Sequence, residues 1–111
     1  MKKFYLFCSA GMSTSLLASK MQKVADEHKI PVEVKAFAIG TMAEVIEKYN
    51  PDCILLGPQV RYLYNDTKNR YSSLNKPILV IDSEDYGLMD GEKVLKKAIV
   101  EYKRYMKENA K

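Results

Sequence analysis

Four short apolar runs alternate with stretches of helical periodicity, and this alternation limits the fold more than any other feature of the chain. The runs are Lys3 to Phe7, Val32 to Phe37, Asp52 to Leu56 and Pro77 to Ile81. Strands that alternate with helices predict a parallel sheet with right-handed crossovers and helices on both faces. With 111 residues, we expect one α/β domain, residues 1–111, built on a doubly wound, flavodoxin-like sheet of strand order 2-1-3-4.

Helical periodicity predicts four helices, two of which carry recognisable caps. Thr41 and Glu44 have the T-x-x-E spacing of a capping box, so the second helix should begin there. Asp90 can cap the last helix with its side-chain oxygen. The expected helices cover residues 13–28, 41–49, 61–71 and 90–106, with a polar loop at 82–89 and a frayed tail at 107–111.

Composition excludes several classes of protein. The longest apolar stretches, Phe4 to Cys8 and Cys53 to Gly57, are far shorter than the roughly 20 residues that cross a bilayer. Two cysteines without a Cys/His cluster predict neither a disulfide framework nor a metal site, and free thiols suit a reducing compartment. The net charge is +4 without a basic run, which favours a solvated surface or a docking face for a phosphorylated protein over nucleic-acid binding. We therefore expect a cytoplasmic protein.

The segment after the first strand combines small and hydroxyl-bearing residues with the start of a helix. Free backbone N–H groups and the positive end of a helix dipole form an anion site there, and Gly11 permits backbone angles that side chains forbid. A plain cluster of helix caps is the alternative for the hydroxyl residues taken singly. The candidate phosphate-binding residues are Ser9, Ala10, Gly11, Met12, Ser13, Thr14 and Ser15.

Cys8 stands immediately before this loop and is the candidate nucleophile. A nearby helix N-terminus stabilises a thiolate by roughly 0.3–1 kcal/mol, so we expect the pKa of Cys8 to lie below the ~8.5 of a free thiol. The alternative is a small buried core residue, the usual position of a free cysteine. That alternative is our prediction for Cys53, which lies inside an apolar strand.

The chemistry open to Cys8 is limited by what surrounds it in the sequence. His28 follows the helix start by about fifteen residues, or about 22 Å, so a Cys–His dyad is not expected. Cysteine phosphatases place an arginine six positions after the cysteine, where it stabilises the hydrolytic transition state, and here Thr14 occupies that position. The loop therefore predicts a phosphoryl carrier. A phosphatase or arsenate-reductase-like enzyme and a non-enzymatic anion-sensing domain remain alternatives.

Three segments also match a known family in order and spacing. They are CSAGMSTSLL (Cys8 to Leu17), ILLGPQVRY (Ile54 to Tyr62) and DYGLMDGEKVL (Asp85 to Leu95). Together they resemble the lactose/cellobiose type of enzyme IIB in the bacterial phosphoenolpyruvate-dependent sugar phosphotransferase system. The resemblance implies a four-stranded parallel sheet and a phosphocysteine intermediate at Cys8.

The resemblance further implies a protein-phosphohistidine–sugar phosphotransferase without a metal or other cofactor. Its cysteine would accept the phosphoryl group from a phosphohistidine of enzyme IIA and pass it to a sugar held by the membrane-embedded enzyme IIC. The sugar is expected to be a β-linked disaccharide such as cellobiose or chitobiose. We expect the isolated chain to be monomeric and to associate with the inner face of the membrane through enzyme IIC.

Two other loops are expected near the phosphate. Gly57, Pro58 and Gln59 should approach it or help to form the docking face, with an ordinary strand-end turn as the alternative. Asp85 is expected to cap its loop, because an acid beside a phosphocysteine would repel it. Arg61 either steers a phosphorylated partner or is an ordinary surface residue.

Overall fold

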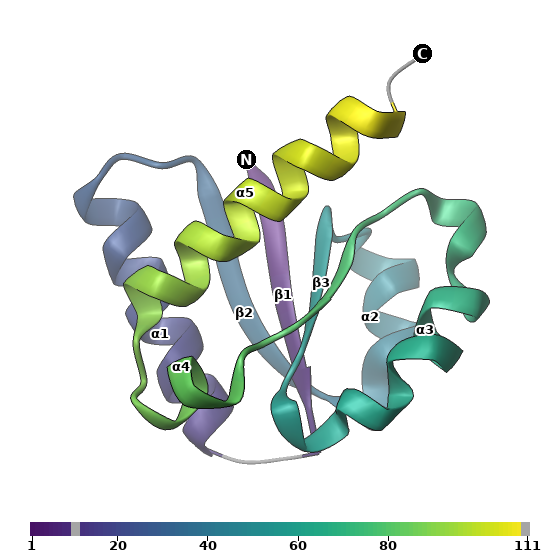
Figure 1. Cartoon of the computed structure of the whole chain (residues 1–111), viewed down its shortest axis with the longest axis horizontal. Helices are drawn as coiled ribbons and strands as arrows, with labels where there is room; N and C mark the ends of the chain where they lie inside the picture. Colours follow the sequence, from purple (N-terminus) through teal and green to yellow (C-terminus); the bar gives the residue numbers. More distant parts are fainter. Residues whose placement is uncertain (10–11, 110–111) are drawn as a thin grey trace.

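The computed structural model describes residues 1–9 and 12–109, and the strands within this part form one parallel sheet (Figure 1). The strand order is β2-β1-β3-β4, as predicted. The strands are β1 (Lys2–Cys8), β2 (Val32–Ala38), β3 (Cys53–Leu56) and β4 (Ile78–Val80). β1 is central, with Cys8 opposite Ala38 of β2 and Phe7 opposite Leu56 of β3.

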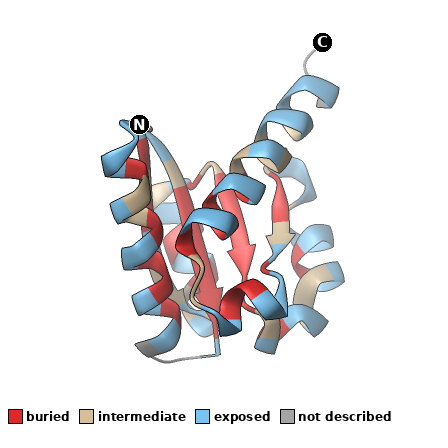
Figure 2. Ribbon diagram, turned by 60° about the vertical axis from the view of Figure 1, so that its left-hand side comes forward, coloured by how far each residue is buried: buried red, intermediate tan, exposed pale blue. Residues whose placement is uncertain are grey.

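The central place of β1 follows from its side chains. Phe4 to Cys8 are all buried, which requires cover on both faces of the sheet. β2 carries polar residues between its apolar ones and forms one edge of the sheet, as its alternation predicted. Figure 2 shows that the buried residues gather in the strands and on the sides of the helices that face them.

Helices cover both faces of the sheet (Figure 1). α1 (Met12–Glu27) and α5 (Gly91–Asn109) pack on the face that carries Phe4 and Leu6. α2 (Met42–Tyr49) and α3 (Tyr64–Arg70) cover the opposite face, with Tyr5 and Phe7. α1 and α5 lie so close together that a Cβ on Gly91 would be 2.8 Å from the backbone carbon of Lys20.

The predicted capping box at Thr41 is wrong, although α2 begins at Met42, close to the expected position. The Thr41 hydroxyl donates backward to the Ala38 carbonyl oxygen at 2.7 Å and makes no side-chain cap to α2. This bond lies across the 3₁₀ turn η1 (Ile39–Thr41), so the hydroxyl serves the turn before the helix.

The predicted helix at residues 61–71 is divided in two. A 3₁₀ segment, η2 (Pro58–Leu63), precedes α3, and a second one, η3 (Ser72–Leu74), follows it. Val60 has non-helical backbone angles inside η2 and is buried. The backbone angles of Val60 thus interrupt the regular helix at a residue whose side chain is buried.

The segment predicted as a polar loop at residues 82–89 contains a short helix, α4 (Ser83–Gly87). Asp82 caps α4 by accepting from the N–H groups of Glu84 and Asp85. Asp90 caps α5, as predicted, because its Oδ1 accepts from the Lys93 N–H at 3.0 Å.

The predicted tail begins too early, since α5 continues through residues 107–109. Residues 110 and 111 lie outside the described part. Within the described residues, no helix is both long and apolar enough to cross a membrane.

Candidate active site

The end of β1 and the segments after β3 and β4 lie together at the end of the sheet where the parallel strands finish, at the bottom of Figure 1. Hydrogen bonds beyond the strands hold them in register. The Gly57 N–H donates to the Phe7 carbonyl oxygen at 2.8 Å, and the Ile81 N–H donates to the Leu56 carbonyl oxygen at 2.8 Å. The end of β1 and the segments after β3 and β4 therefore lie side by side at this edge, while residues 10–11 of the first predicted loop lie outside the described part.

Cys8 is the last residue of β1, and it is buried at this edge. Its thiol donates to Gln59 Oε1, with Sγ 3.1 Å from that oxygen, and its Sγ lies 3.9 Å from the Ser9 hydroxyl oxygen. α1 begins at Met12, shortly after Cys8. A helix N-terminus carries partial positive charge, so this position favours the thiolate form.

Gly57 provides the space in which Cys8 and Gln59 meet. A Cβ on Gly57 would lie 2.9 Å from Cys8 Sγ and 3.0 Å from Gln59 Oε1. The φ of Gly57 is −64°, which any residue adopts. The glycine is therefore required by the close approach of the thiol and not by the backbone conformation.

The predicted phosphate-binding residues have different environments. Ser13 and Ser15 are exposed in the first turns of α1, whereas Thr14 is buried. The Thr14 hydroxyl lies 2.9 Å from the Tyr86 hydroxyl and forms a hydrogen bond with it. Ala10 and Gly11 lie outside the described residues.

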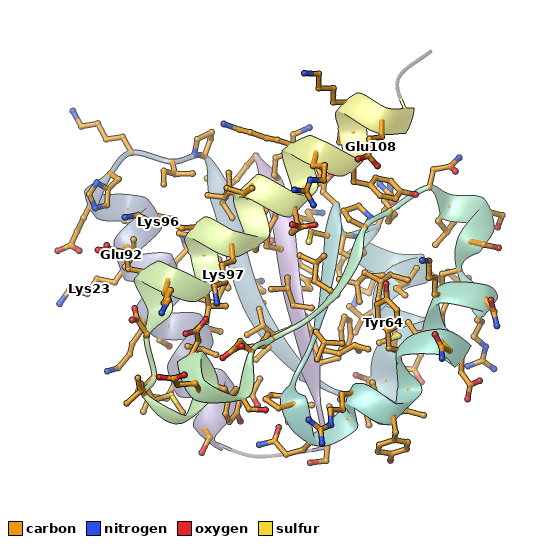
Figure 3. The ribbon with its side chains drawn as sticks, in the orientation of Figure 1. Lys23, Tyr64, Glu92, Lys96, Lys97 and Glu108 are labelled. Carbon is orange, nitrogen blue, oxygen red and sulfur yellow. The ribbon has the colours of Figure 1, made fainter. Side chains whose placement is uncertain are left out.

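Asp85 does not cap its loop, so that prediction is wrong. Its buried carboxylate accepts from the Lys97 ammonium, with Oδ2 2.6 Å from Nζ, and Lys93 Nζ lies 3.6 Å from Oδ1. Figure 3 shows Lys97 on the side of α5 that faces α4. The hydrogen bond from Lys97 lowers the pKa of Asp85, and the same bond raises the pKa of Lys97. An ionised carboxylate has no proton to give, which argues against an acid role for Asp85.

This ion pair was missed by sequence reasoning. Lys93 and Lys97 are four residues apart in α5 and so share one face of the helix. That spacing was the available signal, but a pair of lysines on an amphipathic helix usually faces solvent. The contact depends on α4, which the sequence did not predict.

Cys53 and His28 lie away from this site, as predicted. Cys53 begins β3 in the hydrophobic core, and burial raises the pKa of its thiol. His28 follows the C-terminal end of α1 and is exposed. Both lie near the end of the sheet where the strands begin, because β3 starts there and α1 ends there. Cys8 lies at the other end, where the strands finish.

Large apolar side chains are exposed around the loops that follow the strands. Leu16 is in α1, Tyr62 is in η2, and Leu88 follows α4. Arg61, beside Tyr62, is also exposed. The sequence gives no signal that these three apolar residues are exposed, because their exposure depends on how each helix packs.

The sequence of this chain matches that of a known protein family. The sequence model of the family described as "PTS system, Lactose/Cellobiose specific IIB subunit" matches residues 3–97. The chain belongs to this family. It is thus the IIB component of a sugar phosphotransferase system of the lactose/cellobiose type, and such components are phosphotransferases that work with IIC partners.

Relatives named for different sugars are similar to the chain to comparable degrees. The galactose-specific EIIB component of Lactococcus lactis subsp. cremoris is 42% identical over 97 residues, covering 85% of this chain and 90% of that protein. The oligo-beta-mannoside-specific EIIB component of Bacillus subtilis is 36% identical over 99 residues, covering 89% and 94%. The lactose-specific EIICB component of Streptococcus mutans is 29% identical over 81 residues, which are 73% of this chain and 14% of that protein.

Solved structures of IIB components superpose well on this chain. The cellobiose-specific phosphotransferase IIB component from Borrelia burgdorferi superposes with a TM-score of 0.74 at 35% identity, covering 94% of each chain. The lactose-specific IIB domain from Streptococcus pneumoniae gives a TM-score of 0.82 at 22% identity, covering 91% of this chain and 97% of that one. The second likeness shows the shared fold.

Proposed function

We propose that Cys8 carries a phosphoryl group from a phosphohistidine of an enzyme IIA partner to a sugar held by enzyme IIC. The observation that carries this proposal is the position of its thiol at the end of β1, beside the start of α1 and 3.1 Å from the Gln59 amide oxygen. Family membership supports it, because the chain is a phosphotransferase component whose only other cysteine, Cys53, is enclosed in the core.

The relay consists of two in-line transfers at one sulfur atom. The Cys8 thiolate attacks phosphorus as the N–P bond of phosphohistidine breaks, and the electron pair of that bond returns to the imidazole nitrogen. A sugar hydroxyl oxygen then attacks phosphorus, the S–P bond breaks with its electron pair returning to sulfur, and the hydroxyl proton leaves to a base of the partner or to solvent. The sulfur ends as it began, as a thiolate.

The surroundings of Cys8 can hold the phosphoryl oxygens between the two transfers. N–H groups at the start of α1 donate toward an anion, and the Ser9 hydroxyl already lies near the sulfur. Gln59 can offer its amide N–H₂ in place of its oxygen after a turn of the side chain. We therefore assign phosphate binding to the loop after β1, with Gln59 as a second contact.

Two features favour a carrier over a hydrolase. Thr14 stands where a phosphatase has its arginine, and its hydroxyl is bonded to Tyr86. Asp85, the acid nearest this hydroxyl pair in the sequence, is ionised and held by Lys97. Attack by water on a phosphocysteine needs a base to take a proton from the water, and the Asp85 carboxylate is already engaged by Lys97 and Lys93. Because Thr14 also cannot stabilise the transition state as an arginine would, hydrolysis is slow.

The partners would dock around the loops that follow the strands. Leu16, Tyr62 and Leu88 supply exposed apolar contacts there, and Arg61 adds a positive charge suited to a phosphorylated partner. Such docking places the chain at the cytoplasmic face of the membrane through enzyme IIC. We propose a β-linked disaccharide such as cellobiose or chitobiose as the sugar, and a monomer as the isolated state.

Transfer of radiolabelled phosphate from phosphorylated IIA tests the proposal. Cys8→Ala should abolish labelling, while Cys53→Ala, which removes the other thiol, should be labelled like the wild type. Unfolding curves confirm that both variants are folded. Normal labelling of the Cys8→Ala variant would show that another residue carries the phosphoryl group.

Two further measurements test the acceptor and the rival chemistry. In the presence of membranes that contain the matching IIC, the label on Cys8 should be transferred to cellobiose or chitobiose in preference to galactose or lactose. The opposite preference would refute the sugar assignment. A carrier should show negligible hydrolysis of para-nitrophenyl phosphate. Sustained turnover that disappears in Cys8→Ala would instead identify a cysteine phosphatase.

A further inference from the structure

A buried pair of hydroxyl groups joins the first turn of α1 to α4. The Thr14 and Tyr86 oxygens are 2.9 Å apart, although the residues are 72 positions apart in the sequence. Both side chains are buried, so water does not compete for the bond. A hydrogen bond of this kind is costly to break, because each hydroxyl would be left without a partner in a low-dielectric environment.

Thr14 belongs to the part of α1 whose N–H groups face the proposed phosphate. A helix that starts at Met12 has its unpaired N–H groups in its first turn, which includes Thr14. The orientation of that turn therefore decides where those N–H groups point. Any contact that fixes the Thr14 side chain also fixes this orientation.

Tyr86 is itself held in place from several sides. α4 has only five residues, too few for a helix to be stable alone. Asp82 caps its start, and the buried Asp85 binds Lys97 and Lys93 of α5. These contacts attach α4 to α5 and hold the Tyr86 hydroxyl in place. Its hydrogen bond therefore restrains the Thr14 side chain.

Either hydroxyl can be the donor in this hydrogen bond, because each carries one proton and can also accept. Whichever group donates, the bond restrains both side chains. The pair thus fixes the Thr14 side chain together with the first turn of α1.

We propose that Tyr86 is a positioning residue for phosphoryl transfer: its hydroxyl fixes Thr14, and with it the first turn of α1, in the orientation that receives a phosphoryl group on Cys8. This inference rests on the proposed function of Cys8. Tyr86 does not touch the reacting atoms. It acts through Thr14, and the contacts of Asp85 with α5 hold it in place.

Four variants separate this role from ordinary packing. Tyr86→Phe and Thr14→Val each remove one hydroxyl while keeping the bulk of the side chain, the double variant removes both, and Thr14→Ser restores the hydroxyl. Tyr5→Phe is the matched control, because Tyr5 is also buried and its hydroxyl donates to Glu33 at 2.6 Å, away from the site.

The rate of Cys8 labelling is measured at increasing concentrations of phosphorylated IIA. We expect Tyr86→Phe and Thr14→Val each to lower the rate at saturating IIA by about tenfold, as the loss of one buried hydrogen bond predicts, with the half-saturating concentration unchanged. The double variant should be no slower than either single one, and Thr14→Ser should approach the wild type. An unchanged rate in Tyr86→Phe, an equal loss in Tyr5→Phe, or additive losses in the double variant would each overturn the proposal.

Alkylation of Cys8 by iodoacetamide gives a readout that does not depend on phosphoryl transfer. Tyr86→Phe should alter the alkylation rate at fixed pH, because the helix turn beside the thiol has shifted, and Tyr5→Phe should leave it unchanged. If the wild type takes no label from IIA, the proposed function fails, yet this comparison still decides whether Tyr86 sets the environment of Cys8. Equal alkylation rates in Tyr86→Phe and the wild type would overturn the positioning role.

Discussion

Cys8 and Cys53 lie on adjacent strands of one sheet and are almost equally buried, with exposed fractions of 2% and 0%. Cys53 starts β3 among core side chains, where burial and the nearby charge of Asp52 raise the pKa of its thiol. Cys8 ends β1 beside the start of α1, with an amide oxygen and a hydroxyl near its sulfur. Two thiols that are equally buried therefore have different surroundings. The position of each cysteine along its strand decides which groups surround it.

The edge of the sheet where the strands begin, near Cys53, and the edge where they end, near Cys8, differ in what their polar groups contact. At the edge near Cys53, Asp52 accepts from the Lys3 N–H at 2.8 Å, and the Lys3 ammonium donates to the Tyr49 carbonyl oxygen at 3.0 Å. These bonds tie strands and helix to one another. At the edge near Cys8, where the strands end, Gln59 instead directs its side chain toward the Cys8 sulfur. The first edge holds the fold together, and the second is where the parallel fold can present chemistry.

The largest effect expected from this comparison is in thiol alkylation. In the native protein, Cys8 should react with iodoacetamide at least on the order of a hundredfold faster than Cys53, because Cys53 must wait for the core to open. Mass spectrometry of partly alkylated protein gives both rates in one sample.

Urea provides the control for that measurement. Above the unfolding midpoint the two thiols should react at similar rates, since both are then in an open chain. Equal rates in the native protein would mean that Cys8 is as inert as a core cysteine, and the distinction between the two edges would be lost.

The next effect separates two glycines that lie in close contacts. Gly57→Ala should slow phosphoryl transfer to Cys8 markedly, because the new Cβ would lie 2.9 Å from Sγ and 3.0 Å from Gln59 Oε1. The Gln59 side chain can move aside but the short, buried Cys8 side chain has little room, so we expect a loss of unfolding free energy within the roughly 1–3 kcal/mol typical of overpacking. Labelling by phosphorylated IIA and urea unfolding measure the two effects.

Gly91→Ala is the matched substitution away from the site. Its Cβ would meet the backbone of Lys20 and Met21 at 2.8 to 2.9 Å, and backbone cannot move aside as a side-chain end can. We expect a loss of about 1–3 kcal/mol in unfolding free energy with labelling of Cys8 retained in the folded fraction. If Gly91→Ala impaired transfer more than Gly57→Ala did, the close approach at Gly57 would have no special role.

The fold could be predicted further than the site. An apolar β1 needs cover on both faces, and an alternating β2 suits an edge, so the places of these two strands followed from patterns within single segments. The position of Cys8 at a strand end followed in the same way. These features are local, so the spacing of apolar and polar residues within one segment is enough to predict them.

Such patterns could not predict contacts between segments that are far apart in the sequence. Thr14 meets Tyr86, and Asp85 meets Lys97, only because a short helix forms in a segment that reads as a polar loop. Thr41 satisfied the spacing of a capping box, yet its hydroxyl found a nearer acceptor in the preceding turn. Spacing shows which bonds are possible, and competition between partners in space decides which are made.

The smallest expected effect concerns stability as a function of pH. It depends on the ion pairs that Asp85 of α4 makes with Lys97 and Lys93 of α5. The pKa of Asp85 is lowered in the folded state by the hydrogen bond from Lys97. A group with a lowered folded pKa stabilises the fold above its unfolded pKa of about 3.9, and that contribution is lost as the pH falls through the folded value. The wild type should therefore be more stable than Asp85→Asn near neutral pH, and the difference should shrink below about pH 4.

Urea unfolding from pH 7 to pH 3 measures this difference, and Asp52→Asn at the other edge controls for the loss of a negative charge. Because Lys97 and Lys93 are more than half exposed, salt should reduce the advantage of the wild type at pH 7. If α4 also holds Tyr86 in place, Asp85→Asn should slow labelling of Cys8 at pH 7 while Asp52→Asn leaves it unchanged. A stability difference between Asp85→Asn and the wild type that stayed constant down to pH 3 would show that the carboxylate charge adds nothing, and α4 would then be held by packing alone.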